Sequence, residues 1–127
     1  MRPGSDAAKR AKVIHEWHKA LLHEAVPLLI RKWEGKLKVE VRGYFLQRMK
    51  TKWGSCNHRK QHIRLNTELV KKPKDLLEYV TVHEMAHLLE STHNTRFTAL
   101  MDQFMPGWHN YRTMLNRLPV RHENWSH

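Results

Sequence analysis

The sequence has one cysteine, no long hydrophobic run and few acidic residues. Cys56 has no second cysteine to pair with, so the chain cannot form an internal disulfide and a cytoplasmic location is expected. The longest apolar run, residues 25–30, is broken by Pro27 and is far shorter than the about 18 residues that a membrane helix needs. The first twelve residues contain no apolar segment of the kind found in secretory signals. These absences argue against a secreted domain and against a membrane partner.

Acidic residues are in the minority, with 12 Asp and Glu against 23 Lys and Arg and a formal net charge of +11. The excess is concentrated in residues 31–74, which carry fourteen basic and three acidic side chains, while the flanking segments are nearly balanced. A positive segment of this kind attracts acidic partners, and nucleic acid is one such partner. The alternative is a well-solvated surface without a partner.

The length of 127 residues predicts a single domain, residues 1–127, that buries roughly two-thirds of its unfolded surface. An N-terminal helix is expected from Asp6 to Trp33, kinked at Pro27 and followed by Gly35. Its apolar stripe comprises Val13, Trp17, Ala20, Leu21, Ala25, Leu28 and Leu29.

Alternating apolar and charged residues predict strands over residues 37–42 and 44–53. In the second of these, Phe45, Met49 and Trp53 share one face. A turn at residues 54–60 and a third strand over 62–66 follow, which gives a small antiparallel sheet with basic residues outside.

The strongest chemical signal is the HExxH motif formed by His83, Glu84 and His87. Residues four apart on a helix share a face, with Cβ atoms roughly 5–6 Å apart. Both imidazoles therefore reach one Zn²⁺, which needs Zn–N bonds of about 2.0–2.1 Å. Glu84 lies beside the metal position, where it can act as a general base toward water. The opposite face of this helix is expected to bury Val82, Met85 and Leu89.

A catalytic zinc site has three protein ligands and one open position, so a third ligand is needed. His93 follows His87 at a workable spacing if the helix ends near Glu90 and the chain turns back. Asn94 or Thr95 can cap a following helix and so fix His93 in place. We therefore expect His93 to be the third ligand.

One other peptidase family and two other residues fit part of this pattern. Metzincin peptidases share the histidine spacing but have a glycine where this chain has Glu90. A gluzincin takes a glutamate from a later helix, and the only glutamate beyond Glu90 is Glu123, in a polar tail. Asp102, on the next helix, is the main competitor.

Two amphipathic helices are expected after His93, separated by Pro106-Gly107. The first contains Phe97, Leu100, Met101 and Phe104, and the second contains Trp108, Tyr111, Leu115 and Leu118. In the second helix, His109, Tyr111 and Arg112 are candidates for a group that stabilises an oxyanion.

Four segments together carry a family resemblance: TKWGSC at 51–56, IRLN at 63–66, TVHEMAHLLE at 81–90 and HNTRF at 93–97. From about residue 44 to 118 the chain resembles the YgjP-like metallopeptidases, relatives of the SprT-like group. The resemblance implies a zincin fold with His83, His87 and His93 on zinc and Glu84 as the general base.

The segment Trp53-Gly54-Ser55 can be interpreted in two ways. A strand beside the cleft can pair with an extended peptide substrate, and Gly54 would permit close backbone approach. Alternatively the segment is a structural turn, with Trp53 in the core and Cys56 as a small buried residue.

The sequence as a whole predicts a small α+β zinc-dependent peptidase acting on peptides or proteins. One alternative is a SprT-like protease that cuts proteins held on nucleic acid. Another is a non-catalytic nucleic-acid-binding module with a structural zinc. A fourth protein ligand would favour that module, whereas an open position would favour the enzyme.

Overall fold

The computed structural model describes residues 3–50 and 52–117, with side chains from residue 7 onward. Its elements are α1 (Pro3–Leu37), β1 (Gly43–Gln47), β2 (Gly54–Asn57), β3 (His62–Asn66), the 3₁₀ helix η1 (Thr67–Lys71), α2 (Lys74–Ala86), α3 (Thr95–Phe104) and α4 (Trp108–Arg117). The predicted α+β class and the two helices after the motif are confirmed. The predicted end of the last helix at Leu118 lies outside the described residues.

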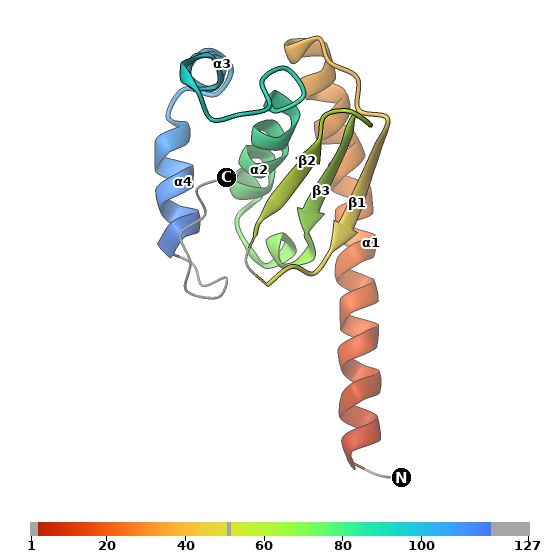
Figure 1. The fold of residues 1–127 in the computed structure, drawn as a ribbon. Coiled ribbons are helices and arrows are strands. Elements are labelled where there is room, and N and C mark those ends of the chain that lie inside the picture. The colour runs from red at the N-terminus through yellow and green to blue at the C-terminus, as the bar shows by residue number, and fades with distance from the viewer. Residues whose placement is uncertain (1–2, 51, 118–127) are drawn as a thin grey trace.

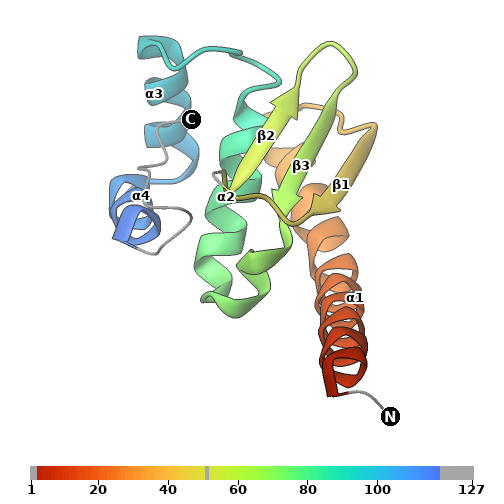
Figure 2. The same cartoon turned by 60° about the horizontal axis from the view of Figure 1, so that its bottom comes forward.

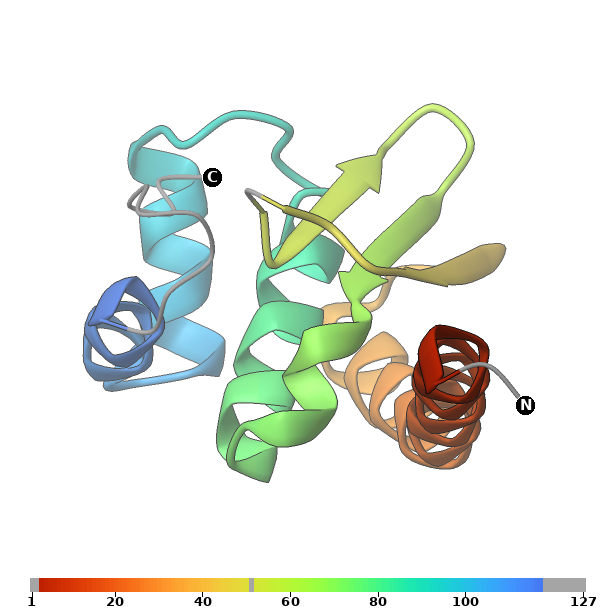
Figure 3. The same cartoon turned by 90° about the horizontal axis from the view of Figure 1, so that it is seen from below.

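Helix α2 is the central element of the fold. It contacts α1, β2, β3, α3 and α4. Figure 3 shows it on one side of the sheet, between α1 and the pair α3 and α4. All of its residues from Leu76 to Ala86 are buried except Glu78. A helix buried on every side is a core element, so the motif residues on α2 are held by the best-packed part of the fold.

The sheet has the order β1-β3-β2 and is mixed. Strands β2 and β3 form an antiparallel hairpin, although residues 54–57 were predicted to belong to the turn before the third strand. Strand β1 instead pairs with β3 in parallel, with Gly43 opposite His62 and Gln47 opposite Asn66, so the prediction of a wholly antiparallel sheet is wrong. The parallel pairing joins segments that are far apart in the chain, and local patterns do not reveal such a pairing.

Two predicted strand boundaries are also wrong. Residues 37–42 are not a strand, because Leu37 still belongs to α1 and Lys38, with a φ of 58°, ends the helix. Val39 and Val41 pack against the core, as their alternation suggested, but the segment has no strand partner. Further along, the strand predicted over 44–53 ends at Gln47, and the predicted turn begins with strand β2.

Asn66 fixes the path of the chain between β1 and β2. Its fully buried side chain donates hydrogen bonds to the carbonyls of Met49 and Lys52, at 2.9 and 2.8 Å. Its oxygen accepts from the backbone of Glu68 at 3.0 Å and so caps η1, while its backbone N–H donates to Trp53. One buried side chain thus determines where β2 begins.

Helix α1 is longer than predicted, continues through Pro27 and packs through a different face. The buried residues are Leu22, Val26, Ile30, Trp33 and Leu37. Val13, Trp17 and Leu28, predicted to form the packed stripe, are 67%, 60% and 64% exposed. The N-terminal half of the helix extends beyond the rest of the molecule (Figures 1 and 2). None of the described helices combines the length and the apolarity needed to cross a bilayer.

Candidate metal centre

Three histidine side chains meet at the C-terminal end of α2. The Nε2 atoms of His83 and His87 are 3.2 Å apart, and the Nε2 atom of His93 lies 3.2 Å from the first and 3.0 Å from the second. His83 and His87 are almost fully buried, whereas His93 is exposed. The structure therefore brings together all three predicted ligands, with His93 on the open side.

This triangle of nitrogens has the size that a metal ion requires. Two nitrogens bound to one tetrahedral zinc ion, each at about 2.0–2.1 Å, lie about 3.3 Å apart. The observed separations of 3.0–3.2 Å differ from that spacing by a few tenths of an ångström at most. Imidazole nitrogens suit zinc and other late first-row metals better than magnesium or calcium. The three residues therefore fit a metal ion of this group.

The orientation of the His87 ring is fixed by a hydrogen bond from the ring nitrogen that does not face the other histidines. Its Nδ1 lies 3.0 Å from the carbonyl oxygen of Glu90, and because a carbonyl can only accept, Nδ1 must carry the proton. The lone pair of the neutral ring is then on Nε2, which faces the other two histidines. A backbone carbonyl that orients a metal-binding histidine in this way is a common feature of metal sites.

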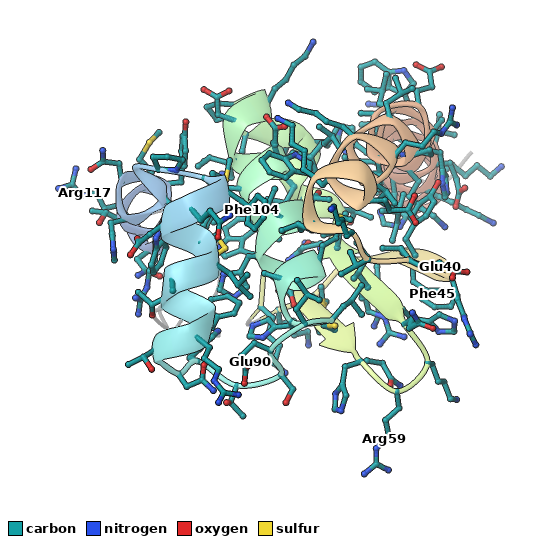
Figure 4. All side chains as sticks on the ribbon, turned by 90° about the horizontal axis from the view of Figure 1, so that it is seen from above. Glu40, Phe45, Arg59, Glu90, Phe104 and Arg117 are labelled. Carbon is teal, nitrogen blue, oxygen red and sulfur yellow. The ribbon has the colours of Figure 1, made fainter. Side chains whose placement is uncertain are left out.

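The loop between His87 and His93 is held by Glu90 and Asn94. The Glu90 carboxylate accepts a hydrogen bond from the Asn94 side chain at 2.7 Å, and Figure 4 shows Glu90 on this loop. Asn94 in turn caps α3 by accepting from the Phe97 N–H at 3.0 Å, which confirms the predicted cap. His93 thus lies between two residues, Glu90 and Asn94, whose side chains are held by hydrogen bonds.

Helix α2 ends earlier than predicted, at Ala86 rather than near Glu90. The following turn leaves Leu89 46% exposed, so the prediction that Leu89 is buried with Val82 and Met85 is wrong. The early end gives the chain the additional residues that it needs to return to the metal position at His93.

Phe97 was expected only as part of an amphipathic helix, yet it contacts the whole cluster. Its ring stacks on that of His87, with centroids 4.4 Å apart and an interplanar angle of 16°. It also lies 5.0 Å from the His83 ring and 4.9 Å from the His93 ring. This apolar ring limits the rotation of the three imidazoles. Its position in the first turn of the helix that directly follows His93 was the signal in the sequence.

Glu84 is fully buried beneath the first residue of β2. A Cβ atom added to Gly54 would lie 2.9 Å from Cγ and Oε2 of Glu84 and 2.9 Å from Cγ1 of Val80. Only glycine leaves room for this carboxylate, and the requirement is one of space, because the Gly54 φ is not positive. Glu84 is the only acidic residue buried among the described residues, and a metal ion beside it would offset the cost of burying its charge.

The three residues predicted to bind substrate have different environments. The Trp53 side chain is 2% exposed and belongs to the core. Gly54 is buried against α2, and Ser55 is half-buried. Strand β2 is at the edge of the described sheet, so its outer backbone groups are not used by β3. Burial and the nearby Glu84 charge raise the pKa of Cys56 to about 12, so its thiol stays protonated at neutral pH and is a poor nucleophile.

Asp102 does not join the histidine cluster. Among the residues that the structure describes, the group able to hold a metal consists of His83, His87 and His93 alone. The Asp102 side chain accepts a hydrogen bond from Trp108 Nε1 at 2.8 Å and is 59% exposed. It thus links α3 to α4.

The predicted oxyanion candidates on α4 fall into two groups. Tyr111 stacks on Tyr79, whose ring edge faces His83 at a centroid distance of 5.8 Å. Burial raises the pKa of Tyr79, and the positive charge of Arg112 opposes this rise. His109 instead stacks on Trp108 and lies 4.0 Å from Asp102.

Comparison with known proteins agrees with this geometry. Two crystal structures share the fold: the metallopeptidase zymogen abylysin of Pyrococcus abyssi, with a TM-score of 0.65, and the metallopeptidase zymogen jannalysin of Methanocaldococcus jannaschii, with a TM-score of 0.62. Each is 18% identical over 72% of this chain, which covers 92% and 94% of theirs, respectively. A comparison with curated proteins found no match. The family model of the YgjP-like metallopeptidase domain matches residues 1–118, and the chain therefore belongs to the YgjP-like metallopeptidase family.

Proposed function

We propose that this metallopeptidase is a zinc enzyme that hydrolyses peptide bonds through His83, His87, His93 and Glu84. The observation that carries the proposal is the convergence of three Nε2 atoms, 3.0–3.2 Å apart, beside a buried glutamate. Family membership supports a peptide or protein substrate. A single domain over residues 1–127 and a cytoplasmic location remain predictions.

Each residue has a distinct task in this proposal. The three imidazoles hold the ion, and bound Zn²⁺ would lower the pKa of a water molecule toward about 7 and polarise the scissile carbonyl. Glu84 accepts the proton of the attacking water and returns it to the leaving amine. Tyr111 and Arg112, on the side of α4 that faces Tyr79, are the candidates for stabilising the oxyanion.

The number of protein ligands favours a catalytic role for the metal. Structural zinc sites are closed by four protein ligands, whereas catalytic sites have three and an open position. Within the described part of the chain only the three histidines converge, with His93 on the exposed side. The three-ligand set supports the enzyme over the non-catalytic module with a structural zinc.

Strand β2 is the proposed substrate-binding edge. A peptide that adds to the edge from Gly54 to Asn57 would lie next to Glu84, since Gly54 touches that side chain. The backbone of Gly54 and Ser55 would supply the hydrogen bonds. Trp53 contributes from the core, where it helps Asn66 to fix the start of the strand.

Enlarging Gly54 tests the proposed position of Glu84. In Gly54→Ala the new methyl group must displace Glu84 or Val80, because it would lie 2.9 Å from both. We expect bound zinc to be retained, hydrolysis to fall at least tenfold and the free energy of unfolding to fall by about 1–3 kcal/mol. Gly35→Ala is the matched control, because a Cβ there meets nothing within 4 Å. Equal activity of wild type and Gly54→Ala would contradict the close packing of β2 on Glu84.

Removal of the metal tests the proposed function itself. Purified protein would be assayed on a fluorescently labelled unfolded protein before and after treatment with a chelator. We expect hydrolysis to be lost on chelation and restored by added Zn²⁺ but not by Mg²⁺, because a site of three imidazoles favours zinc. Undiminished hydrolysis by protein shown to be free of metal would refute the proposal.

A second candidate function is hydrolysis of proteins held on nucleic acid. It is favoured by the positive charge of residues 31–74, which lies partly on the sheet next to the proposed substrate edge. Faster hydrolysis of a DNA-bound protein than of the same protein free in solution would support this candidate.

A further inference from the structure

One face of the sheet is uncovered in the described structure. Helices α1 and α2 lie on its other side, as the view from below shows (Figure 3). In the middle of the open face, the strand register places Phe45 of β1 beside Arg64 of β3, and Arg64 beside Ser55 of β2. Phe45 is 46% exposed, although a large aromatic side chain gains most from burial.

Phe45 and two neighbours form an aromatic and cationic platform. The His62 ring lies 5.2 Å from the Phe45 ring at an interplanar angle of 71°. The His62 ring extends from β3 over Gly43 of β1, since a Cβ atom added to Gly43 would lie 3.3 Å from the ring. The guanidinium carbon of Arg64 is 5.6 Å from the centre of the Phe45 ring. The three side chains are thus held together, and Phe45 still exposes nearly half of its surface.

The platform borders a shallow cavity of about 320 Å³ whose charged lining is entirely basic. Lys60, His62 and Arg64 line it, together with Phe45, Ser55, Cys56, Asn57 and Ile63. The nearby Arg59 extends from the turn between β2 and β3 away from the body of the molecule (Figure 4).

The cations of this surface are not neutralised by the protein. Among the described residues, no ion pair involves Arg59, Lys60 or Arg64. Other basic residues of segment 31–74 are engaged elsewhere: Lys32 pairs with Glu78, and both Arg48 and Lys71 pair with Glu68. The surface of Phe45, Arg59, Lys60, His62 and Arg64 therefore combines cations without an ion pair and an exposed aromatic ring, and it is open to an anionic partner.

We propose that this open face of the sheet binds single-stranded nucleic acid. Proteins that bind single strands combine cations along the phosphate backbone with exposed aromatic rings on which bases stack, and this surface has both. A duplex presents no free base to Phe45, and an acidic peptide would need the cations but not the ring. The surface borders the proposed substrate edge, because Ser55 directly follows Gly54. Binding does not require hydrolysis and can be tested separately from it.

The test uses Glu84→Gln protein, a fluorescent oligothymidylate and anisotropy titrations at several salt concentrations. We expect measurable binding near 150 mM salt with micromolar protein, and a logarithmic salt slope of about −0.7 per phosphate contacted. The triple substitution Arg59→Gln, Lys60→Gln and Arg64→Gln should reduce the size of the slope by about 2. As the matched control, Lys9→Gln, Arg10→Gln and Arg117→Gln remove three exposed cations from α1 and α4 and should change it little. Equal changes in both variants would overturn the proposal.

The variant Phe45→Ala tests whether the anionic partner of this surface is a single-stranded nucleic acid. Loss of one stacking contact should weaken binding of the oligothymidylate about five- to a hundredfold and leave duplex binding unchanged. Phe45→Trp, which keeps a stacking ring, should retain the affinity. No binding with tens of micromolar protein, or full affinity in Phe45→Ala, would refute the proposal. So would competition by polyglutamate as strong as that by unlabelled oligothymidylate, which would indicate a site for acidic peptides.

Discussion

Replacing Glu84 by glutamine is expected to reduce hydrolysis by about two to four orders of magnitude while the protein stays folded and binds zinc. Glutamine has nearly the size of glutamate and fits the fully buried space beneath Gly54. It cannot accept the proton of the attacking water, and loss of a general base costs about 10²–10⁴-fold in rate. The metal ligands themselves are unchanged.

The measurement pairs turnover of a labelled unfolded protein with metal analysis of the same sample. Zinc content and circular dichroism of Glu84→Gln should match wild type, which assigns the loss to chemistry rather than to folding. If Glu84→Gln protein that is free of contaminating proteases turned over substrate at the wild-type rate, Glu84 would not be the base.

Removing one histidine of the cluster is expected to abolish tight zinc binding. His93→Ala is the most informative of the three variants, because His93 is exposed and its loss leaves the core intact. The remaining pair, His83 and His87, would hold the metal through two nitrogens instead of three. We expect the protein to be folded after dialysis and nearly free of zinc.

Asp102→Ala is the control for His93→Ala. The Asp102 carboxylate accepts from Trp108 and lies outside the histidine group, so this variant should keep its zinc. It should lose only about 1 kcal/mol of stability, through the lost hydrogen bond between α3 and α4. Full zinc occupancy in His93→Ala would refute His93 as the third ligand, and loss of zinc in Asp102→Ala as well would assign that role to Asp102.

The metal centre could be predicted because its parts are local. The four-residue spacing of His83 and His87 follows from helix geometry alone. The return of the chain to His93 depends on a short turn and on the cap formed by Asn94, both readable from nearby residues. Residues close in the chain sufficed to bring the three nitrogens within 3.2 Å of one another.

The surroundings of the centre could not be predicted, because they depend on contacts between distant segments. Phe45 was expected on the same face as Trp53, but β1 ends at Gln47 and pairs in parallel with β3, which leaves Phe45 on the open face. The contact of Gly54 with Glu84 joins residues thirty positions apart. No local pattern specifies which turn of a later helix a glycine will meet.

The error in α1 has a different physical cause. The helix carries apolar residues on two opposite faces, one with Val13, Trp17 and Leu28 and the other with Val26 and Ile30. Periodicity identifies a helix from either face but cannot choose between them. The choice is made by the partner: α2 receives the second face, and Lys32 and Trp33 donate hydrogen bonds to Glu78 there.

The local arrangement of the metal ligands also has a thermodynamic consequence. The three proposed ligands lie within residues 83–93, so the unfolded chain carries the complete ligand set on one short segment. Little loop-closure entropy opposes metal capture by that segment, and an ion bound to the unfolded state subtracts from the stabilisation that binding gives the native state. Zinc should therefore raise the midpoint of thermal unfolding by less than its affinity for the native site implies. The native state should then be stabilised mainly by the packing around the buried helix α2, with a smaller net contribution from the metal.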